Sequence, residues 1–180
     1  MAEKLYEIEV RKVVPTEHGI AVVLGNDEQA FVMHIGTNEG AALIRALKGE
    51  HADRPLTHDL LEYVLDGFEV QIKHVVISDI VDRTFCATLT LQQRCKNGDE
   101  WAGLTNEVKI DARPSDCIVL AVKRGAPIFV SDVVLSQVPN AIANEAKRKK
   151  ANPLGLSDFS SFQDQLDSMD FDELLGADED

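Results

Sequence analysis

The stretch "KIDARPSDCIVLAVKRGAPIFV", Lys109–Val130, joins three secondary-structure elements. A run with strand-like alternation ends at Asp111, and an apolar run with helical spacing begins after Arg113 and ends before Gly125. Pro114 suits the first turn of a helix, because the N–H group that proline lacks would have no partner there. The short run "PIFV" then favours a strand. The stretch therefore predicts a strand, a helix and another strand in this order.

The residues before this stretch form two groups of three predicted strands. Each group alternates apolar and polar residues or runs through β-branched residues, with Asn, Asp and Gly in the turns. The predicted strands cover residues 4–14, 20–25, 29–36, 68–80, 83–94 and 104–111. Asn97-Gly98 is a strong signal for a type I′ hairpin turn, so the last two strands are expected to be antiparallel neighbours.

Helices are predicted between and after the strand groups. They cover residues 37–49, 56–67 and 114–124, with a last short helical turn over 131–137. Thr37 or Asn38 is the expected N-cap of the first helix, and Thr57 that of the second. These elements predict an α+β fold of antiparallel or mixed β-meanders with three main helices. Because each half has three strands and then a helix that ends at glycine, an internal duplication is compatible with the sequence.

The chain is long enough for one compact domain and an appendage. We expect residues 1–140 to form the domain, 141–156 a basic linker and 157–180 an acidic tail. Apolar side chains recur at helical spacing in the tail, at Phe159, Phe162, Leu166 and Met169. The tail is therefore either a helix that docks on a protein partner, or a segment that packs on its own domain or stays disordered.

The charge of the chain argues against passive binding of nucleic acid. Residues 1–140 carry 14 Lys/Arg and 21 Asp/Glu, a net charge of −7, and the whole chain carries −13. Nucleic-acid chemistry would therefore need a local basic patch or a metal ion.

The expected compartment is the cytoplasm. The sequence has no apolar run of roughly 18 residues, so no membrane span is predicted, and its charged N-terminus is unlike a signal peptide. Cys86, Cys95 and Cys117 are an odd number of cysteines without a CxxC pair, which favours reduced thiols.

Two polar junctions are candidates for a functional site. The sequence contains no Gly-rich phosphate loop, HExxH or GxSxG motif. Instead, Thr57-His58-Asp59 and Asp111-Ala112-Arg113-Pro114-Ser115-Asp116 both stand where a helix begins, a place that binds anions well. Asp111 and Asp116 have the oxygen ligands that Mg²⁺ or Mn²⁺ prefers, Arg113 can bind a phosphate, and His58 can transfer protons.

Each of these residues also has a purely structural interpretation. Asp116 and Asp59 suit the first turn of a helix, where the helix dipole favours a carboxylate. Ser115 fits a helix start equally well, and Arg113 can simply pair with Asp111 or Asp116. Glu39, at the start of the first predicted helix, carries the same ambiguity. Spacing alone leaves both interpretations open.

Three segments resemble a known family. "RPLTHDLL" (54–61), "IDARPSDCIVLAVKRGAPIFV" (110–130) and "HIGTNEGAALIRALKG" (34–49) are similar to motifs of the bifunctional nuclease family. The resemblance spans about residues 5–137 and implies an α+β domain that acts on DNA and RNA. Gly40 and Cys117 stand where that family usually has alanine, and both are small enough to be expected neutral.

The resemblance also implies a set of site residues. The matching polar positions are Glu39, Thr57, His58, Asp59, Asp111, Arg113, Ser115 and Asp116. The residues expected to be catalytic are His58, Asp59, Arg113, Ser115 and Asp116. Those expected to bind a metal are Glu39, Asp111 and Asp116.

The sequence thus supports two hypotheses from different classes. The first is a nuclease that cleaves phosphodiester bonds of DNA and RNA with the help of Mg²⁺ or Mn²⁺, in which the two junctions form one pocket. The second is a non-catalytic regulatory or adaptor domain whose tail, residues 157–180, binds a protein partner. A homodimer is compatible with the predicted edge strands and apolar helix faces. Proximity of His58 to Asp116 would favour one shared site.

Overall fold

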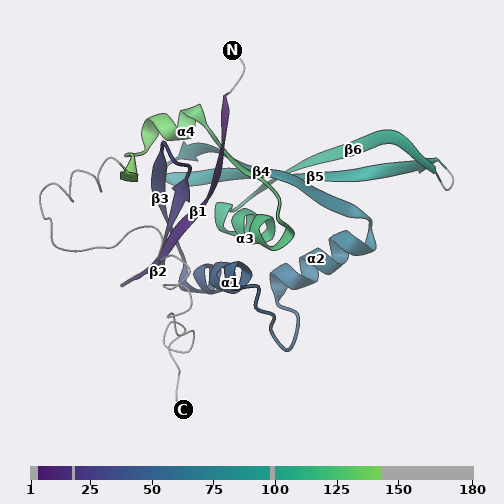
Figure 1. Ribbon diagram of the computed structural model, residues 1–180, viewed down its shortest axis with the longest axis horizontal. Helices are drawn as coiled ribbons and strands as arrows, with labels where there is room; N and C mark the ends of the chain where they lie inside the picture. Colours follow the sequence, from purple (N-terminus) through teal and green to yellow (C-terminus); the bar gives the residue numbers. More distant parts are fainter. Residues whose placement is uncertain (1–3, 18, 98–99, 143–180) are drawn as a thin grey trace, which may run out of the picture.

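The computed structural model describes residues 4–17, 19–97 and 100–142 (Figure 1). The strands are β1 (Leu5–Thr16), β2 (Gly19–Gly25), β3 (Ala30–Ile35), β4 (Val70–Val81), β5 (Thr84–Asn97), β6 (Glu100–Ala112) and β7 (Ile128–Ser131). The helices are α1 (Thr37–Lys48), α2 (Thr57–Gly67), α3 (Pro114–Arg124) and the short α4 (Asp132–Gln137). Every predicted strand and helix is present.

The strands form one mixed sheet of seven strands in the order β3-β2-β1-β7-β4-β5-β6. β1–β2–β3 and β4–β5–β6 are antiparallel meanders, and β7 joins them, antiparallel to β1 and parallel to β4. The predicted α+β class is confirmed. Both halves of the chain have three strands followed by a helix, and α2 precedes the three strands of the second half. That this order arose by duplication stays a prediction.

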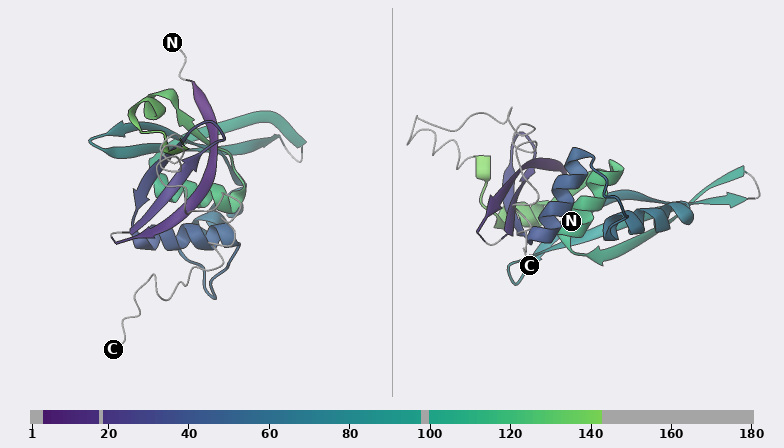
Figure 2. Two further views of the ribbon diagram at one scale, coloured as in Figure 1. Left: turned by 60° about the vertical axis from the view of Figure 1, so that its left-hand side comes forward. Right: turned by 90° about the horizontal axis from the view of Figure 1, so that it is seen from below.

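α1, α2 and α3 lie on the same side of the sheet (Figures 1 and 2). α1 and α3 pack against each other beneath it and build the core with the strands. Alternation along β4 explains the burial, since Val75 and Ile77 are fully buried while Val76 between them faces the other side. Because α1 and α3 are fixed in the core, the residues at their first turns are held at defined positions.

The N-cap residues of α1 and α2 differ from the prediction. Thr37 and Thr57 are the first helical residues, and Gly36 and Leu56 hold the N-cap positions. The predicted side-chain caps are therefore wrong. In α2 the carboxylate of Asp59 instead accepts a hydrogen bond from the backbone N–H of Leu56 at 2.8 Å. The third helical residue therefore supplies the acceptor for the N–H group at the N-cap position. α3 begins at Pro114, as predicted.

Two small residues near the helix starts have distinct environments. A Cβ atom on Gly40 would lie 2.1 Å from Cγ1 and 2.7 Å from Cβ of Ile20 on β2, so alanine would force the α1–β2 contact apart. The expectation that Gly40 is interchangeable with alanine is wrong for this chain. Cys117 is fully buried, and burial raises the pKa of its thiol to about 12. Cys117 is therefore a neutral core residue.

Several predictions fall outside the described ranges. They concern the loop at 98–99, most of the linker 141–156 and the tail 157–180, while for Cys95 in β5 the backbone is described and the side chain is not. The domain boundary at residue 140 stays a prediction. Among the residues that the structure describes, no helix has the length and apolar character needed to cross a membrane.

Candidate functional site

The first turns of α2 and α3 meet in space. His58 on α2 and Asp116 on α3 are 58 positions apart in the chain, yet His58 Nε2 lies 3.2 Å from Asp116 Oδ1. Both side chains are mostly buried, with exposed fractions of 18% and 29%. The two polar junctions of the sequence therefore form one cluster, which favours a shared site over two separate helix caps.

Arg113 joins this cluster to α1. Its guanidinium donates to both carboxylate oxygens of Asp116, from Nε at 2.7 Å and from Nη2 at 3.1 Å. Its Nη1 donates to Glu39 Oε1 at 2.8 Å, and the side chain is 66% exposed. A guanidinium has five N–H donors, so two remain for another acceptor. Arg113 is thus both a bridge between two carboxylates and a cation open to solvent.

The electrostatics of the cluster keep Asp116 ionised. Partial burial alone would raise its pKa, but hydrogen bonds from Arg113 and His58 outweigh this effect and hold the pKa below its usual range. The pKa of Arg113 is raised by its hydrogen bonds to Asp116 and Glu39. An ionised Asp116 only accepts hydrogen bonds, so His58 donates through Nε2, and Nδ1 of the neutral ring is left as the basic nitrogen.

A second polar contact holds α2 against the last turn of α3. Lys123 Nζ lies 2.7 Å from Asp59 Oδ1 and 3.0 Å from Glu62 Oε2, and these three side chains are 13%, 18% and 12% exposed. Arg124 forms an ion pair with Asp66 one turn farther along. The side of α2 that faces α3 is therefore held by charges.

These ion pairs shift the pKa values of Asp59 and Lys123. The hydrogen bond from Lys123, together with the N–H of Leu56, lowers the pKa of Asp59. Burial alone would lower the pKa of Lys123, but Asp59 and Glu62 outweigh it and raise that pKa. Asp59 and Lys123 therefore both stay charged at neutral pH.

The sequence prediction missed Lys123 and Glu62. Lys123 and Arg124 stand just before the helix-ending Gly125, and Asp59, Glu62 and Asp66 are spaced by three and four residues, which places these three on one face of a helix. Two adjacent cations, Lys123 and Arg124, and an acidic helix face are able to form ion pairs, but only the structure shows that they are in contact.

A small cavity lies behind the cluster, between α1, α2 and α3. It has a volume of about 20 Å³ and is lined among others by Ala46, His58, Asp59 and Lys123. This volume is enough for about one water molecule. Such a water would lie beside the ring of His58 and the ion pair of Lys123.

The predicted metal ligands do not form a metal-binding group in this arrangement. Among the described residues, no three His, Cys, Asp or Glu side chains are placed to hold one ion. Glu39 and Asp116 face the same guanidinium, which occupies the place between them, and Asp111 is exposed at the end of β6. A divalent cation prefers several converging oxygen ligands, and this donor set does not supply them.

Two of the predicted catalytic residues have surroundings of a structural kind. Asp59 binds Lys123 and the N–H of Leu56, so it fixes the position of α2 and thereby of His58. Ser115 is buried at 8% exposure in the first turn of α3. Their catalytic roles stay predictions, whereas His58, Arg113 and Asp116 are the predicted residues that the structure brings together with Glu39.

Comparison with known proteins identifies the family of this chain. The model of the Bifunctional nuclease domain family matches residues 22–143, which contain the whole cluster. Two uncharacterized proteins from two strains of Mycobacterium tuberculosis are 29% identical over 148 residues, which is 82% of this chain and 82% of theirs. "Bifunctional nuclease 2" of Oryza sativa subsp. japonica is 32% identical over 88 residues, 49% of this chain and 25% of that protein. The chain belongs to the bifunctional nuclease domain family.

Proposed function

We propose that this protein is a nuclease that cleaves phosphodiester bonds of DNA and RNA at the cluster of Glu39, His58, Arg113 and Asp116. The observation that carries the proposal is the 3.2 Å contact between His58 and Asp116, with Arg113 on the same carboxylate. A base, a group that orients it and a cation are the parts that phosphodiester hydrolysis requires. The family and the printed name of the rice relative point to the same activity.

In this proposal His58 moves the proton. Asp116 accepts the Nε2–H of His58 and thereby leaves Nδ1 to take a proton from the attacking water. The water oxygen attacks phosphorus, the bond to the leaving oxygen breaks, and solvent supplies the proton that this oxygen needs. Asp116 also stabilises the imidazolium that forms.

Arg113 binds the phosphate. Its exposed guanidinium retains two N–H groups beyond those that bind Asp116 and Glu39, and a planar guanidinium matches the geometry of phosphate oxygens. Because residues 1–140 carry a net charge of −7, this local cation matters more than in a basic nuclease. Glu39 holds Arg113 toward α1 and so fixes the phosphate position.

The role of a divalent ion stays a separate prediction from the carboxylates in the sequence. Glu39, Asp111 and Asp116 do not converge on one ion in this arrangement, and none of the steps above passes through a metal. Mg²⁺ or Mn²⁺ dependence is therefore tested independently of the roles of His58 and Arg113.

The test is cleavage of single-stranded RNA and DNA by the purified full chain, with Mg²⁺, with Mn²⁺ and with a chelator. We expect Asp116→Asn to lower the cleavage rate by about 100-fold or more, because His58 loses the carboxylate that orients it. The matched control is Asp132→Asn, which changes an acidic residue in the first turn of α4, outside the cluster. Equal rates for wild type and Asp116→Asn would point to a contaminating nuclease. No cleavage by wild type would favour the adaptor hypothesis.

A further inference from the structure

α2 has its polar and apolar sides reversed relative to an ordinary surface helix. The side that faces the protein carries His58, Asp59 and Glu62, which are engaged by Asp116 and Lys123. A surface helix normally buries its apolar side and exposes its polar one. In α2 these charges are turned inward beside the buried Leu65, and the other apolar side chains are left on the outside.

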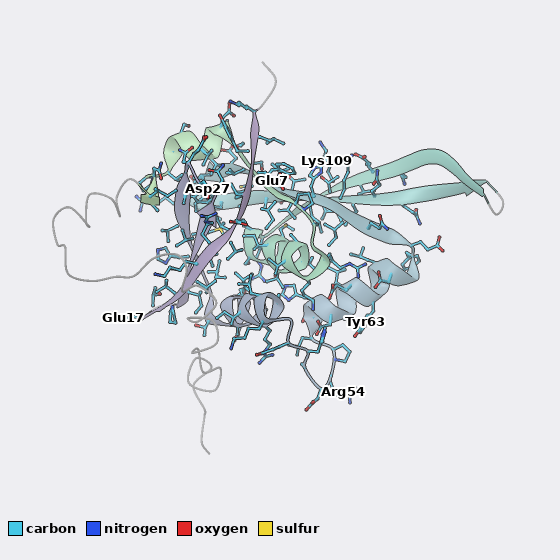
Figure 3. The ribbon with its side chains drawn as sticks, viewed as in Figure 1. Glu7, Glu17, Asp27, Arg54, Tyr63 and Lys109 are labelled. Atoms are coloured by element: carbon cyan, nitrogen blue, oxygen red, sulfur yellow. The ribbon has the colours of Figure 1, made fainter. Side chains whose placement is uncertain are left out.

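We define the outer face of α2 by its exposed apolar side chains and those of its two flanking residues. It consists of Leu56, Leu60, Leu61, Tyr63, Val64 and Phe68. Leu60, Tyr63 and Phe68 are 59%, 60% and 68% exposed. Figure 3 shows Tyr63 on the side of α2 that points away from the sheet.

This exposure is concentrated and not scattered. The outer face of α2 holds six of the twelve large hydrophobic side chains that are exposed in the described part of the chain. Val108 and Ile110 on β6 are also exposed, and their register with Leu91 and Leu89 places them on the sheet face that the helices cover. Soluble proteins leave single apolar side chains exposed, but a grouped apolar surface marks an interaction site.

The outer face of α2 is also suited to a second copy of the same chain. A protein with a net charge of −13 repels its own copies at most surfaces. On the outer face of α2 this repulsion is reduced, because Asp59 and Glu62 are turned toward α3 and bound by Lys123, and the half-exposed Asp66 is paired with Arg124. An acidic chain can therefore approach itself here without placing like charges together.

The size and shape of the outer face fit a two-fold contact. α2 has 11 residues, so it is about 16 Å long, and a two-fold axis would set its apolar side against the same side of the partner. At the exposed fractions of its six side chains, this face presents several hundred Å², of the order of the ~800 Å² that each partner buries in a standard interface.

We propose that the outer face of α2 is a homodimer interface, covered by α2 of a second copy. The contact would hold α2 from the side opposite to its ion pairs with α3. Because α2 carries His58, dimer formation would also steady the position of His58 relative to Asp116. The interface itself does not depend on the proposed nuclease function.

The experiment is the molar mass of the full-length chain in solution, by light scattering after gel filtration and by analytical ultracentrifugation over a range of micromolar concentrations. We expect a dimer of 39.6 kDa, twice the 19.8 kDa of one chain. Tyr63→Glu should weaken the dimer by about 100-fold or more in Kd, because it buries a charge against its own copy. Leu60→Asp should act in the same way, and circular dichroism establishes that both variants are folded.

The matched control is Val133→Glu on α4, which places a charge on an apolar side chain that is 44% exposed outside this face. It should remain dimeric. A wild-type monomer at all concentrations would overturn the proposal, as would a dimer that Tyr63→Glu and Leu60→Asp leave unchanged. A wild-type monomer that dimerises when residues 157–180 are deleted would overturn it in favour of a tail that covers this face.

Discussion

Replacement of His58 with alanine is expected to lower kcat/KM for single-stranded RNA by about 100- to 10,000-fold, the range that general acid–base catalysis contributes. The reason is that His58 is the base of the cluster and its partner Asp116 cannot replace it, since Asp116 stays ionised and is held by Arg113. The measurement is single-turnover cleavage of a labelled oligonucleotide over a pH series. The loss should be largest where the wild-type rate reaches its maximum.

The matched control for this prediction is His34→Ala. His34 is an exposed histidine on β3, outside the cluster. Its removal should leave kcat/KM unchanged within about twofold. If both alanine variants lose activity to the same extent, or if His58→Ala keeps the wild-type rate, His58 is not the catalytic base.

The second large effect concerns stability. We expect Lys123→Met to lower the free energy of unfolding by about 3 kcal/mol, because it removes the cation from two largely buried carboxylates, those of Asp59 and Glu62. Methionine keeps most of the side-chain length, so lost charge and not lost volume explains the effect. Urea denaturation at pH 7 measures it.

The pH dependence of this difference gives a further check. The folded-state pKa of Asp59 lies below its ordinary value of 3.8, so its contribution to stability is fully present above that pH and is lost as the pH falls through the lowered pKa. The gap between wild type and Lys123→Met should therefore shrink in acid.

Lys73→Met is the matched control for the stability measurement. Lys73 pairs with Glu107 on the surface, where both side chains are more than a third exposed. Its loss should cost less than about 1 kcal/mol, as for other exposed ion pairs. Similar losses for Lys73→Met and Lys123→Met would show that the α2–α3 ion pairs do not hold α2.

The strands and helices could be predicted from the sequence because each follows a local pattern. β4 alternates more and less buried side chains over consecutive residues. α3 begins at Pro114 and ends at Gly125, which has a left-handed conformation, so both ends follow from single residues in the sequence. The parallel pairing of β7 with β4 was not predicted, since it joins segments about fifty residues apart and depends on how the helices pack.

The candidate site could be predicted only in part, for the same reason. His58 and Asp116 stand out in the sequence as polar residues at helix starts, but the sequence does not show whether they are in contact. Arg113 lies between Glu39 and Asp116, where the sequence predicts a metal ion. This position depends on the packing of α1 against α3, which the sequence does not show. The reversed polarity of α2 was hidden because its apolar residues have the spacing of an ordinary buried face.

The most direct test of a single shared site is a double-mutant cycle of His58→Ala and Asp116→Asn on kcat/KM. If Asp116 acts by orienting His58, its substitution has little left to remove once His58 is gone, so the double variant should be about as active as His58→Ala alone. A double variant whose loss equals the product of the two single losses would contradict this account, because the two helix starts would then act independently.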